Sequence, residues 1–518
     1  MSITCPACQS SSIIRKGKVL QSGEIVQRYK CKICPSPINN FYTAINDDNI
    51  INNEPAIEST NKNRTWVVTT AVNDVPVNEK FLNTLKSYCE YNNAELLIGA
   101  IKYNQGLNED GYSWDESVIP YLVNTNITLT NGLKYLAGVP VSPAIGNPLS
   151  GFESFSKGDS IILSHPQLMM KTIALSHVDH AAIITTTGCV TEPVYTTTKQ
   201  GSKAQFNHSY SALVIEEDSE IDSFHIRVLN SDESGIFYDI DKKYDNDKVT
   251  KNTNIPAIVL GDEHVAFICP NVMKTTFSNT DSIINTLAPK KIIRHDIYDG
   301  YSASHHHTKN IFTQYAKHIS GKNDVAKELA LTIEHILKTT PDYAESIVVS
   351  SNHNEHLTKW LNEANPKLDH TNAILYHELM YLMLKQTKLG RSGAEYPNPL
   401  ELWAENNYDF DNIKFVGGFD SFKVHDIECV FHSHKGTNGS RGSIEQFSKL
   451  GTKTIIGHSH SPGIFGGCWQ VGHSCESKLE YNYGSPSSWA KAHCLIQPNG
   501  KRQMIFIKEY KTIAKWRR

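Results

Sequence analysis

The first long hydrophobic pattern of the chain consists of a strand, a helix and a second strand. The run WVVTTA at 66–71 is short and β-branched, and AELLIGAI at 94–101 is another apolar run. Between them, Phe81, Leu85 and Tyr88 recur at helical spacing. This order predicts a parallel pair of strands joined by a crossover helix.

Further apolar runs up to residue 230 predict more strands. They lie at 160–165, 181–188, 210–217 and 224–230, and a polar stretch follows near residue 250. We therefore expect an α/β domain of unknown role at residues 65–250 and another domain at 255–518. Between the runs at 160–165 and 181–188 lie three polar residues: His177, Asp179 and His180. We interpret them as a polar strand edge rather than as a metal or acid–base cluster.

After Ile255, side chains that bind metals follow directly after short apolar runs. In chain order they are Asp262, His264, Asp296, Asp299, Asn352, His353, His432, His434, His458 and His460. Side chains two residues apart at a strand end point the same way. Strands of an α/β sheet build their sites at the carboxyl ends. The pattern therefore predicts that these groups converge.

The donor types indicate which metals the site would bind. Carboxylates, several imidazoles and one amide carbonyl suit Mn²⁺, Fe or Zn²⁺ better than Mg²⁺ or Ca²⁺ in a cage of oxygens. Two metals about 3.5–4 Å apart need a shared carboxylate, and Asp296 is the natural bridge. We expect two divalent metals, with Mn²⁺ as the first choice and Fe or Zn²⁺ as alternatives.

The order Asp-x-His, Asp-x-x-Asp, Asn-His, His and Gly-His-x-His resembles the calcineurin-like metallophosphoesterases, a family that includes Mre11-type nucleases. The resemblance spans roughly residues 256–500. It implies an α/β fold in which a metallophosphoesterase β-sandwich is flanked by helices and holds two metals at the edge of a sheet. In this chain His295 and Ser351 stand where the family usually has glycine.

The resemblance also implies a role for each residue. The first metal would be held by Asp262, His264 and His460, the second by Asn352, His432 and His458, and Asp296 would bridge them. His353 would be the catalytic histidine, and Asp299 would orient it or a metal ligand. Either His432 or His434 could be this ligand of the second metal; with His432 as the ligand, His434 would contact substrate instead. Independently of the resemblance, Lys435 and Arg441 in the Gly-rich loop that follows are candidates for contact with substrate phosphate.

The mechanism implied is hydrolysis by a hydroxide that bridges the metals, with in-line attack and no covalent intermediate. His353 would stabilise the developing charge or protonate the leaving oxygen. The loop KGTNGSRG, which contains Lys435 and Arg441, would hold phosphate or would be a plain turn. The run His305, His306 and His307 is interpreted as part of a solvated helix.

The four N-terminal cysteines predict a second kind of metal site. Cys5-x-x-Cys8 and Cys31-x-x-Cys34 have the spacing of a closed tetrahedral site for one structural zinc ion. QRYKCKIC resembles the zinc ribbons of transposases and other proteins that act on DNA. We expect a zinc ribbon at residues 1–43 and a polar linker at 44–64.

Charge and hydropathy narrow the functional classes. The net charge is −4 over 518 residues, but both ends of the chain are rich in Lys and Arg, so local phosphate binding is possible. No run approaches the ~20 apolar residues of a membrane span. The first residues lack the pattern of a secretory signal. We expect a cytoplasmic protein with no membrane partner.

The overall layout resembles the pre-early host-DNA-degradation proteins of large siphophages. This resemblance implies a manganese-dependent DNA nuclease that acts in the host cytoplasm and forms a homo-oligomer. The leading hypothesis is a DNA nuclease. One alternative is a phosphatase or phosphodiesterase for small molecules or phosphoproteins. Another is a non-catalytic adaptor that binds DNA.

Overall fold

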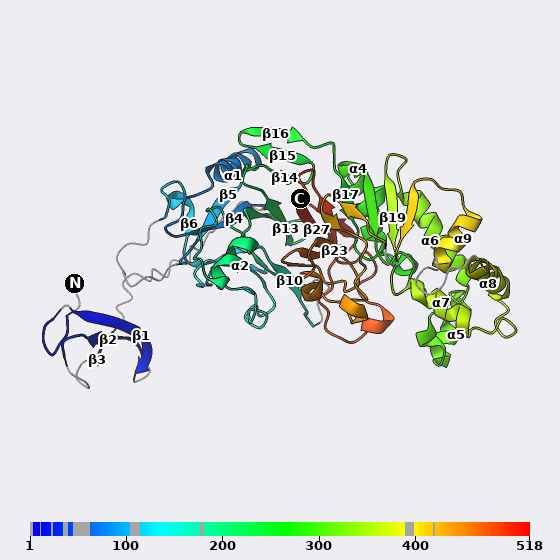
Figure 1. Cartoon of the computed structure of the whole chain (residues 1–518), viewed down its shortest axis with the longest axis horizontal. Coiled ribbons are helices and arrows are strands. Elements are labelled where there is room, and N and C mark those ends of the chain that lie inside the picture. Colours follow the sequence, from blue (N-terminus) through cyan, green and yellow to red (C-terminus); the bar gives the residue numbers. More distant parts are fainter. Residues whose placement is uncertain are drawn as a thin grey trace. The chain divides into compact units, whose positions relative to one another are not determined.

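The structure is a computed structural model that describes residues 4–10, 12–21, 24–34, 40–44, 63–103, 114–176, 181–388, 398–417 and 420–518. The chain divides into two compact units, Met1–Thr60 and Asn61–Arg518. Each unit has its own sheets (Figure 1). The smaller unit contains an antiparallel sheet of β1 (Ile13–Gln21), β2 (Glu24–Cys31) and β3 (Asn40–Ala44).

The larger unit begins with a five-stranded sheet. In spatial order it contains β13 (Ser223–Asn230), β12 (Ser211–Asp218), β4 (Thr65–Val72), β5 (Glu95–Ile101) and β6 (Leu122–Val123). β4 and β5 run parallel and are connected through α1 (Glu79–Asn92), so the predicted crossover unit is confirmed. α1 begins where the Asn78 side chain accepts from Phe81 N–H at 3.0 Å.

A second sheet combines strands from both sides of the boundary that we expected at residues 250–255. Its described strands, in spatial order, are β21 (Lys423–Val424), β22 (Ile427–Glu428), β23 (Lys453–Ile456), β25 (Cys468–Gln470), β24 (Gly463–Phe465), β10 (Met170–Ile173), β11 (Ala182–Thr186), β9 (Ser160–Leu163), β8 (Leu133–Leu136) and β7 (Asn126–Thr130). β10 and β24 form the antiparallel pair that joins the two halves.

A third sheet contains, in spatial order, β20 (Ile413–Val416), β19 (Glu345–Val349), β18 (Lys291–Arg294), β17 (Ala257–Val259), β26 (Ala492–Ile496) and β27 (Arg502–Phe506). β17 to β20 are parallel. Their carboxyl ends therefore lie at one edge of the sheet. Two small antiparallel sheets complete the described strands: β14 (Phe237–Asp239), β15 (Lys242–Asp245) and β16 (Lys248–Lys251), and β28 (Lys508–Tyr510) with β29 (Ile513–Lys515).

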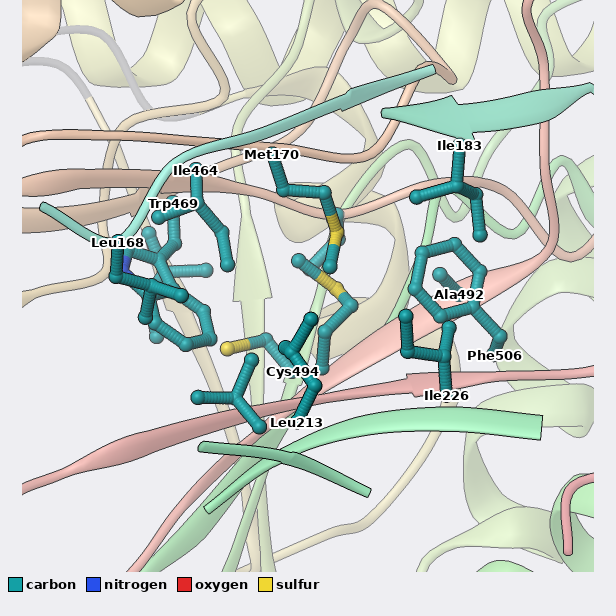
Figure 2. Close-up of a cluster of buried hydrophobic side chains, with 14 of the residues drawn as sticks. Leu168, Met170, Ile183, Leu213, Ile226, Ile464, Trp469, Ala492, Cys494 and Phe506 are labelled. Atoms are coloured by element: carbon teal, nitrogen blue, oxygen red, sulfur yellow. The ribbon is translucent and has the colours of Figure 1, made fainter. Parts of the chain in front are cut away.

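The three large sheets share one hydrophobic core. Successive residues of a strand point to opposite faces. Accordingly, Ala257 and Val259 join this core, while Ile258 between them packs into another cluster. Figure 2 shows Met170, Ile183 and other core residues converging from different strands. The result is a mixed α/β fold in which the third sheet is held against the other two.

Several helices pack against these sheets. The described helices are α1, α2 (Lys199–Asn207), α3 (Pro270–Met273), α4 (Ile283–Leu287), α5 (Ile311–Ser320), α6 (Val325–Thr339), α7 (Asn354–Glu363), α8 (Ala373–Lys388), α9 (Pro399–Asn407) and α10 (Ile444–Phe447). Figure 1 shows α6, α7, α8 and α9 grouped beside β19, and their apolar residues share one cluster. In the described residues, no helix is both long and apolar enough to cross a membrane.

The basic C-terminal residues belong to the folded unit. Lys515 Nζ lies 2.9 Å from Asp218 Oδ2 and 2.6 Å from Glu220 Oε2. The Arg518 guanidinium donates to the Asn63 carbonyl at 2.6 Å. Much of this positive charge is therefore engaged in internal contacts.

Candidate metal centre

Loops from two sheets bring the predicted side chains together. In the third sheet, β17, β18 and β19 end at Val259, Arg294 and Val349, and the loops with Asp262, Asp296 and Asn352 follow. In the second sheet, β22 and β23 are parallel. They lead into the loops with His432, His458 and His460. The site therefore forms at the carboxyl ends of parallel strands, as the strand-end pattern predicts.

One group of ligand atoms is tightly clustered. Asp262, His264, Asp296 and His460 each offer an atom that lies within 4.8 Å of the others. His264 Nε2 lies 3.0 Å from His460 Nε2 and 3.7 Å from Asp296 Oδ2. His460 Nε2 lies 3.2 Å from Asp262 Oδ2. Two imidazole nitrogens and two carboxylates thus face a common point.

A second group lies on the other side of Asp296. His432 Nε2 is 2.9 Å from Asp296 Oδ2 and 3.1 Å from Asn352 Oδ1. The ring of His458 lies 5.2 Å from that of His432 between centroids, and the His458 backbone N–H donates to Asp262 Oδ2 at 2.8 Å. Asp296 Oδ2 therefore lies near imidazole nitrogens of both groups, those of His264 and His432.

His353 and Asp299 lie beside the first group. Asp299 Oδ2 is 3.0 Å from His264 Nδ1, so it holds the ring through the nitrogen that faces away from the cluster. His353 Nε2 lies 4.0 Å from Asp296 Oδ2, and His353 Nδ1 contacts the Asp299 carbonyl. The His353 side chain is 17% exposed, whereas Asp262 and His264 are fully buried. Solvent therefore reaches the His353 side chain but not those of Asp262 and His264.

The buried oxygens fit a cation. Within the described residues, Oδ1 of Asp262 and Oδ1 of Asp296 are buried and have no hydrogen-bond partner. A buried carboxylate oxygen without a partner costs free energy of folding, and coordination to a metal ion would supply the missing partner. The donor set of carboxylates and imidazoles suits a borderline divalent metal. The residues present therefore fit a pair of such ions.

The electrostatics of the cluster favour positive charge at its centre. Burial raises the pKa of Asp262, and the neighbouring Asp296 raises it further. Burial also acts to raise the pKa of Asp296, but His432 and the other histidines bring it well below its usual value. Burial opposes the charging of His264, yet Asp299 and Asp296 raise its pKa to about 9. The carboxylates therefore stabilise a cation among them.

Backbone strain is concentrated at the same loops. Four residues of these loops have a backbone φ in the left-handed region, which residues other than glycine rarely adopt. The angles are 43° for His264, 42° for Asp296, 76° for His458 and 59° for His460. Such strain is often found at functional sites. The structure has space for Asp262 because residue 457 is glycine: a Cβ there would lie 2.5 Å from Asp262 Oδ1.

The predicted substrate residues lie beside the cluster rather than in it. The His434 ring is 5.7 Å from the His432 ring, and His434 Nε2 lies 3.6 Å from Glu355 Oε1. Lys435 forms an ion pair with the same Glu355. Arg441 is exposed and pairs with Lys435 through the backbone. Glu355 therefore already engages two of these groups.

Several residues that pack near the cluster were not predicted from the sequence. His473 stacks on His460, with ring centroids 5.3 Å apart, and His473 Nδ1 lies 3.2 Å from Cys475 Sγ. Trp489 packs on His460 at 4.2 Å. The His-x-Cys spacing at residues 473–475, soon after the short segment CWQV at 468–471, was an available signal. Support of this kind restricts the orientation of a ligand ring.

The N-terminal cysteines form a separate cluster. The four sulfurs of Cys5, Cys8, Cys31 and Cys34 lie within 4.8 Å of one another. Cys5 Sγ is 3.8 Å from Cys34 Sγ, and Cys8 Sγ is 3.5 Å from Cys31 Sγ. Tetrahedral zinc with bonds of about 2.3 Å places sulfurs about 3.8 Å apart. The cluster therefore has the dimensions of a metal site.

Two other predicted groups have different outcomes. His305, His306 and His307 form a single 3₁₀ turn, η4 (His305–His307), in which only His306 is exposed. The predicted helix is this single turn, and its side chains are only partly solvated, because the rings of His305 and His306 pack on that of His356 in α7. His177, Asp179 and His180 lie outside the described residues.

The chain is similar to a phage protein over most of its length. It is 28% identical over 466 residues to Protein A1 of Escherichia phage T5, and the match covers 87% of this chain and 83% of that protein. No protein-family description and no solved structure matches the chain. The similarity agrees with the phage resemblance that the sequence layout indicates.

Proposed function

We propose that this chain is a two-metal phosphodiesterase whose substrate is DNA and whose preferred cation is Mn²⁺. The observation that carries the proposal is the position of Asp296 between the group of Asp262, His264 and His460 and the pair of Asn352 and His432. A bridging carboxylate between two ligand sets is the arrangement that two-metal hydrolysis requires.

Each side chain then has a defined task. Asp262, His264 and His460 would hold one cation, Asn352, His432 and His458 would hold the other, and Asp296 would be shared between them. The bound pair supplies Lewis-acid polarisation of the phosphoryl group and an activated water. Burial of the carboxylates and imidazoles excludes bulk water and strengthens these interactions.

His353 handles the proton of the leaving oxygen. The Asp299 carbonyl accepts from His353 Nδ1–H, so the neutral ring carries its lone pair at Nε2. Only the protonated ring donates from Nε2, which lies toward Asp296 and is partly exposed. His353 therefore stabilises charge on the phosphate or gives a proton to the leaving group.

The proposed fold is the metallophosphoesterase β-sandwich, formed by the second and third sheets with α6 to α9 outside. The shared core of these sheets supports this assignment. The Cys5, Cys8, Cys31 and Cys34 cluster would hold one structural zinc ion in a zinc ribbon.

The N-terminal segment supports DNA as the substrate. The first 40 residues contain one acidic residue, Glu24, and the basic residues Arg15, Lys16, Lys18, Arg28, Lys30 and Lys32. Positive charge of this density contributes to phosphate-backbone binding that is independent of sequence. Similarity to a phage protein supports a role during infection.

The test compares plasmid and linear DNA with a chromogenic phosphodiester and a phosphomonoester, each with Mn²⁺. We expect DNA cleavage by the parent and its loss in Asp262→Asn and His353→Ala. Matched controls are Asp342→Asn and His370→Ala, whose side chains are exposed. Turnover of the small esters without DNA cleavage would contradict the nuclease and favour a small-molecule phosphoesterase. DNA binding with no hydrolysis of any substrate would favour an adaptor.

A further inference from the structure

A second histidine cluster lies next to the candidate centre but shares no ligand with it. His305 and His306 come from η4, and His356 comes from the first turns of α7. One ring nitrogen of each lies within 4.8 Å of those of the other two. The ring centroids are 3.9 Å apart for His305 and His306, 5.1 Å for His305 and His356, and 5.7 Å for His306 and His356.

The burial of this cluster indicates a missing partner. His356 is 9% exposed, and among the described residues Nδ1 of His305 and Nδ1 of His356 are buried without a hydrogen-bond partner. Buried polar atoms are usually satisfied, so two such nitrogens in neighbouring rings require an explanation. No carboxylate belongs to the group, so its ligand atoms are all imidazole nitrogens.

We propose that His305, His306 and His356 bind a third divalent cation, of the zinc class, separate from the pair at Asp296. Three imidazoles with an open fourth position are an established ligand set for zinc. Zinc with tetrahedral bonds of 2.0–2.1 Å draws ligand nitrogens to about 3.3 Å from one another, so small ring movements would complete the site. His306 is exposed, which leaves a route for the ion and a position for water.

The ion would position the proposed catalytic histidine. His356 and His353 lie one turn apart, and the His356 backbone N–H donates to the His353 carbonyl at 3.1 Å. Their rings stack with centroids 5.1 Å apart and an interplanar angle of 27°. A metal ion bound by His356 and the two histidines of η4 would therefore link η4 to the beginning of α7. It would also restrict the orientation of the His356 ring, against which the His353 ring stacks. This consequence depends on the proposed function, whereas binding of the third ion does not.

The experiment is a zinc count on the full-length chain. Parent, His306→Ala and His307→Ala are dialysed against the same buffered Zn²⁺, and bound zinc per chain is measured by mass spectrometry. His307 is the matched control because it belongs to the same turn but contacts Tyr301 and Glu480 instead. We expect His306→Ala to bind one zinc fewer than the parent, and His307→Ala to bind the parental number.

Equal zinc content in the parent and His306→Ala overturns the third site. The Asp262→Asn variant separates this result from the proposed function, because it alters occupancy at Asp296 and leaves the histidine cluster intact. A loss of zinc in Asp262→Asn but not in His306→Ala would therefore leave the main centre standing and remove only the third site.

A ligand swap gives an independent readout. Parent and His306→Cys are both loaded with Co²⁺. The parent should show a thiolate-to-Co²⁺ charge-transfer band in the near ultraviolet from its N-terminal cysteines. His306→Cys should show additional absorbance of this kind, because its thiolate at position 306 would also bind Co²⁺. His307→Cys should add none. Absence of the additional band in His306→Cys, or its presence in both variants, would contradict the assignment.

Discussion

Asp299 shows how a side chain that is not itself a proposed ligand supports the centre. Its carboxylate lies 3.0 Å from His264 Nδ1. Because that contact orients the ring, His264 Nε2 faces His460 and Asp296. Carboxylates that hold metal-binding histidines in this way contribute substantially to affinity.

We predict that Asp299→Asn lowers Mn²⁺ affinity about 10–100-fold, since the amide holds the His264 ring less firmly. Calorimetric titration with Mn²⁺ measures the change, and Asp342→Asn serves as the exposed control. An unchanged affinity in Asp299→Asn would show that the His264 ring does not depend on this carboxylate.

Gly457 has no side chain, and this leaves room for the carboxylate of Asp262. An added Cβ would lie 2.5 Å from Asp262 Oδ1, a distance that forces the carboxylate or the loop to move. We predict that Gly457→Ala loses metal binding at Asp262 while the circular dichroism of the chain is retained. Gly451→Ala is the control because its Cβ would meet no atom within 4 Å. Parental Mn²⁺ binding by Gly457→Ala would contradict the crowding argument.

At the scale of elements, β18 connects the core to the centre through a buried charge network. Arg294, its last residue, donates to both oxygens of Glu263 at 3.0 Å, and His335 of α6 lies 2.9 Å from the same carboxylate. All three are buried. Burial acts to raise the pKa of Glu263, but Arg294 and His335 lower it below its usual value. The carboxylate therefore stays charged next to Asp262.

Removing the arginine leaves that charge without its main partner. We predict that Arg294→Met lowers the free energy of unfolding by about 3–5 kcal/mol, as expected when one side of a buried ion pair is lost. Urea denaturation measures the change.

The first residue of the same strand provides the comparison. Lys291 pairs with Glu345 at 2.9 Å, but the two side chains are 37% and 40% exposed. Lys291→Met should therefore cost about 0–1 kcal/mol. Equal effects of the two substitutions would contradict the distinction between the buried and the exposed pair.

At the scale of the whole molecule, the cysteine cluster and the candidate centre belong to different compact units. The smaller unit is a three-stranded sheet, and a segment of this size generally needs a metal or a disulfide to stay folded. Loss of its metal should therefore have a local effect.

We predict that Cys31→Ser loses one equivalent of zinc and exposes residues 1–60 to proteases, while the metals at Asp296 remain. Limited proteolysis with mass spectrometry locates the cleavage sites, and metal analysis counts the ions. Cys89→Ser is the control, because Cys89 lies on α1 of the larger unit. Loss of the Asp296 metals in Cys31→Ser would show that the two sites depend on each other.

The sequence by itself determined the chemistry that is available at the site. Short apolar runs followed by Asp, His and Asn specify donor types at strand ends, because a parallel sheet collects its carboxyl ends at one edge. The β4–α1–β5 unit was predictable for a similar reason, since periodicity is a local property.

Only the tertiary structure decided which groups meet. β10 pairs with β24, about 290 residues later in the chain. The ring of His305 packs on that of His356, although α5, α6 and β19 lie between them in the sequence. The contacts of Glu263 with Arg294, and of His460 with His473, likewise depend on how separate loops pack together. Such contacts leave no periodic signal, because they arise from the packing of distant segments rather than from the local preferences of either one.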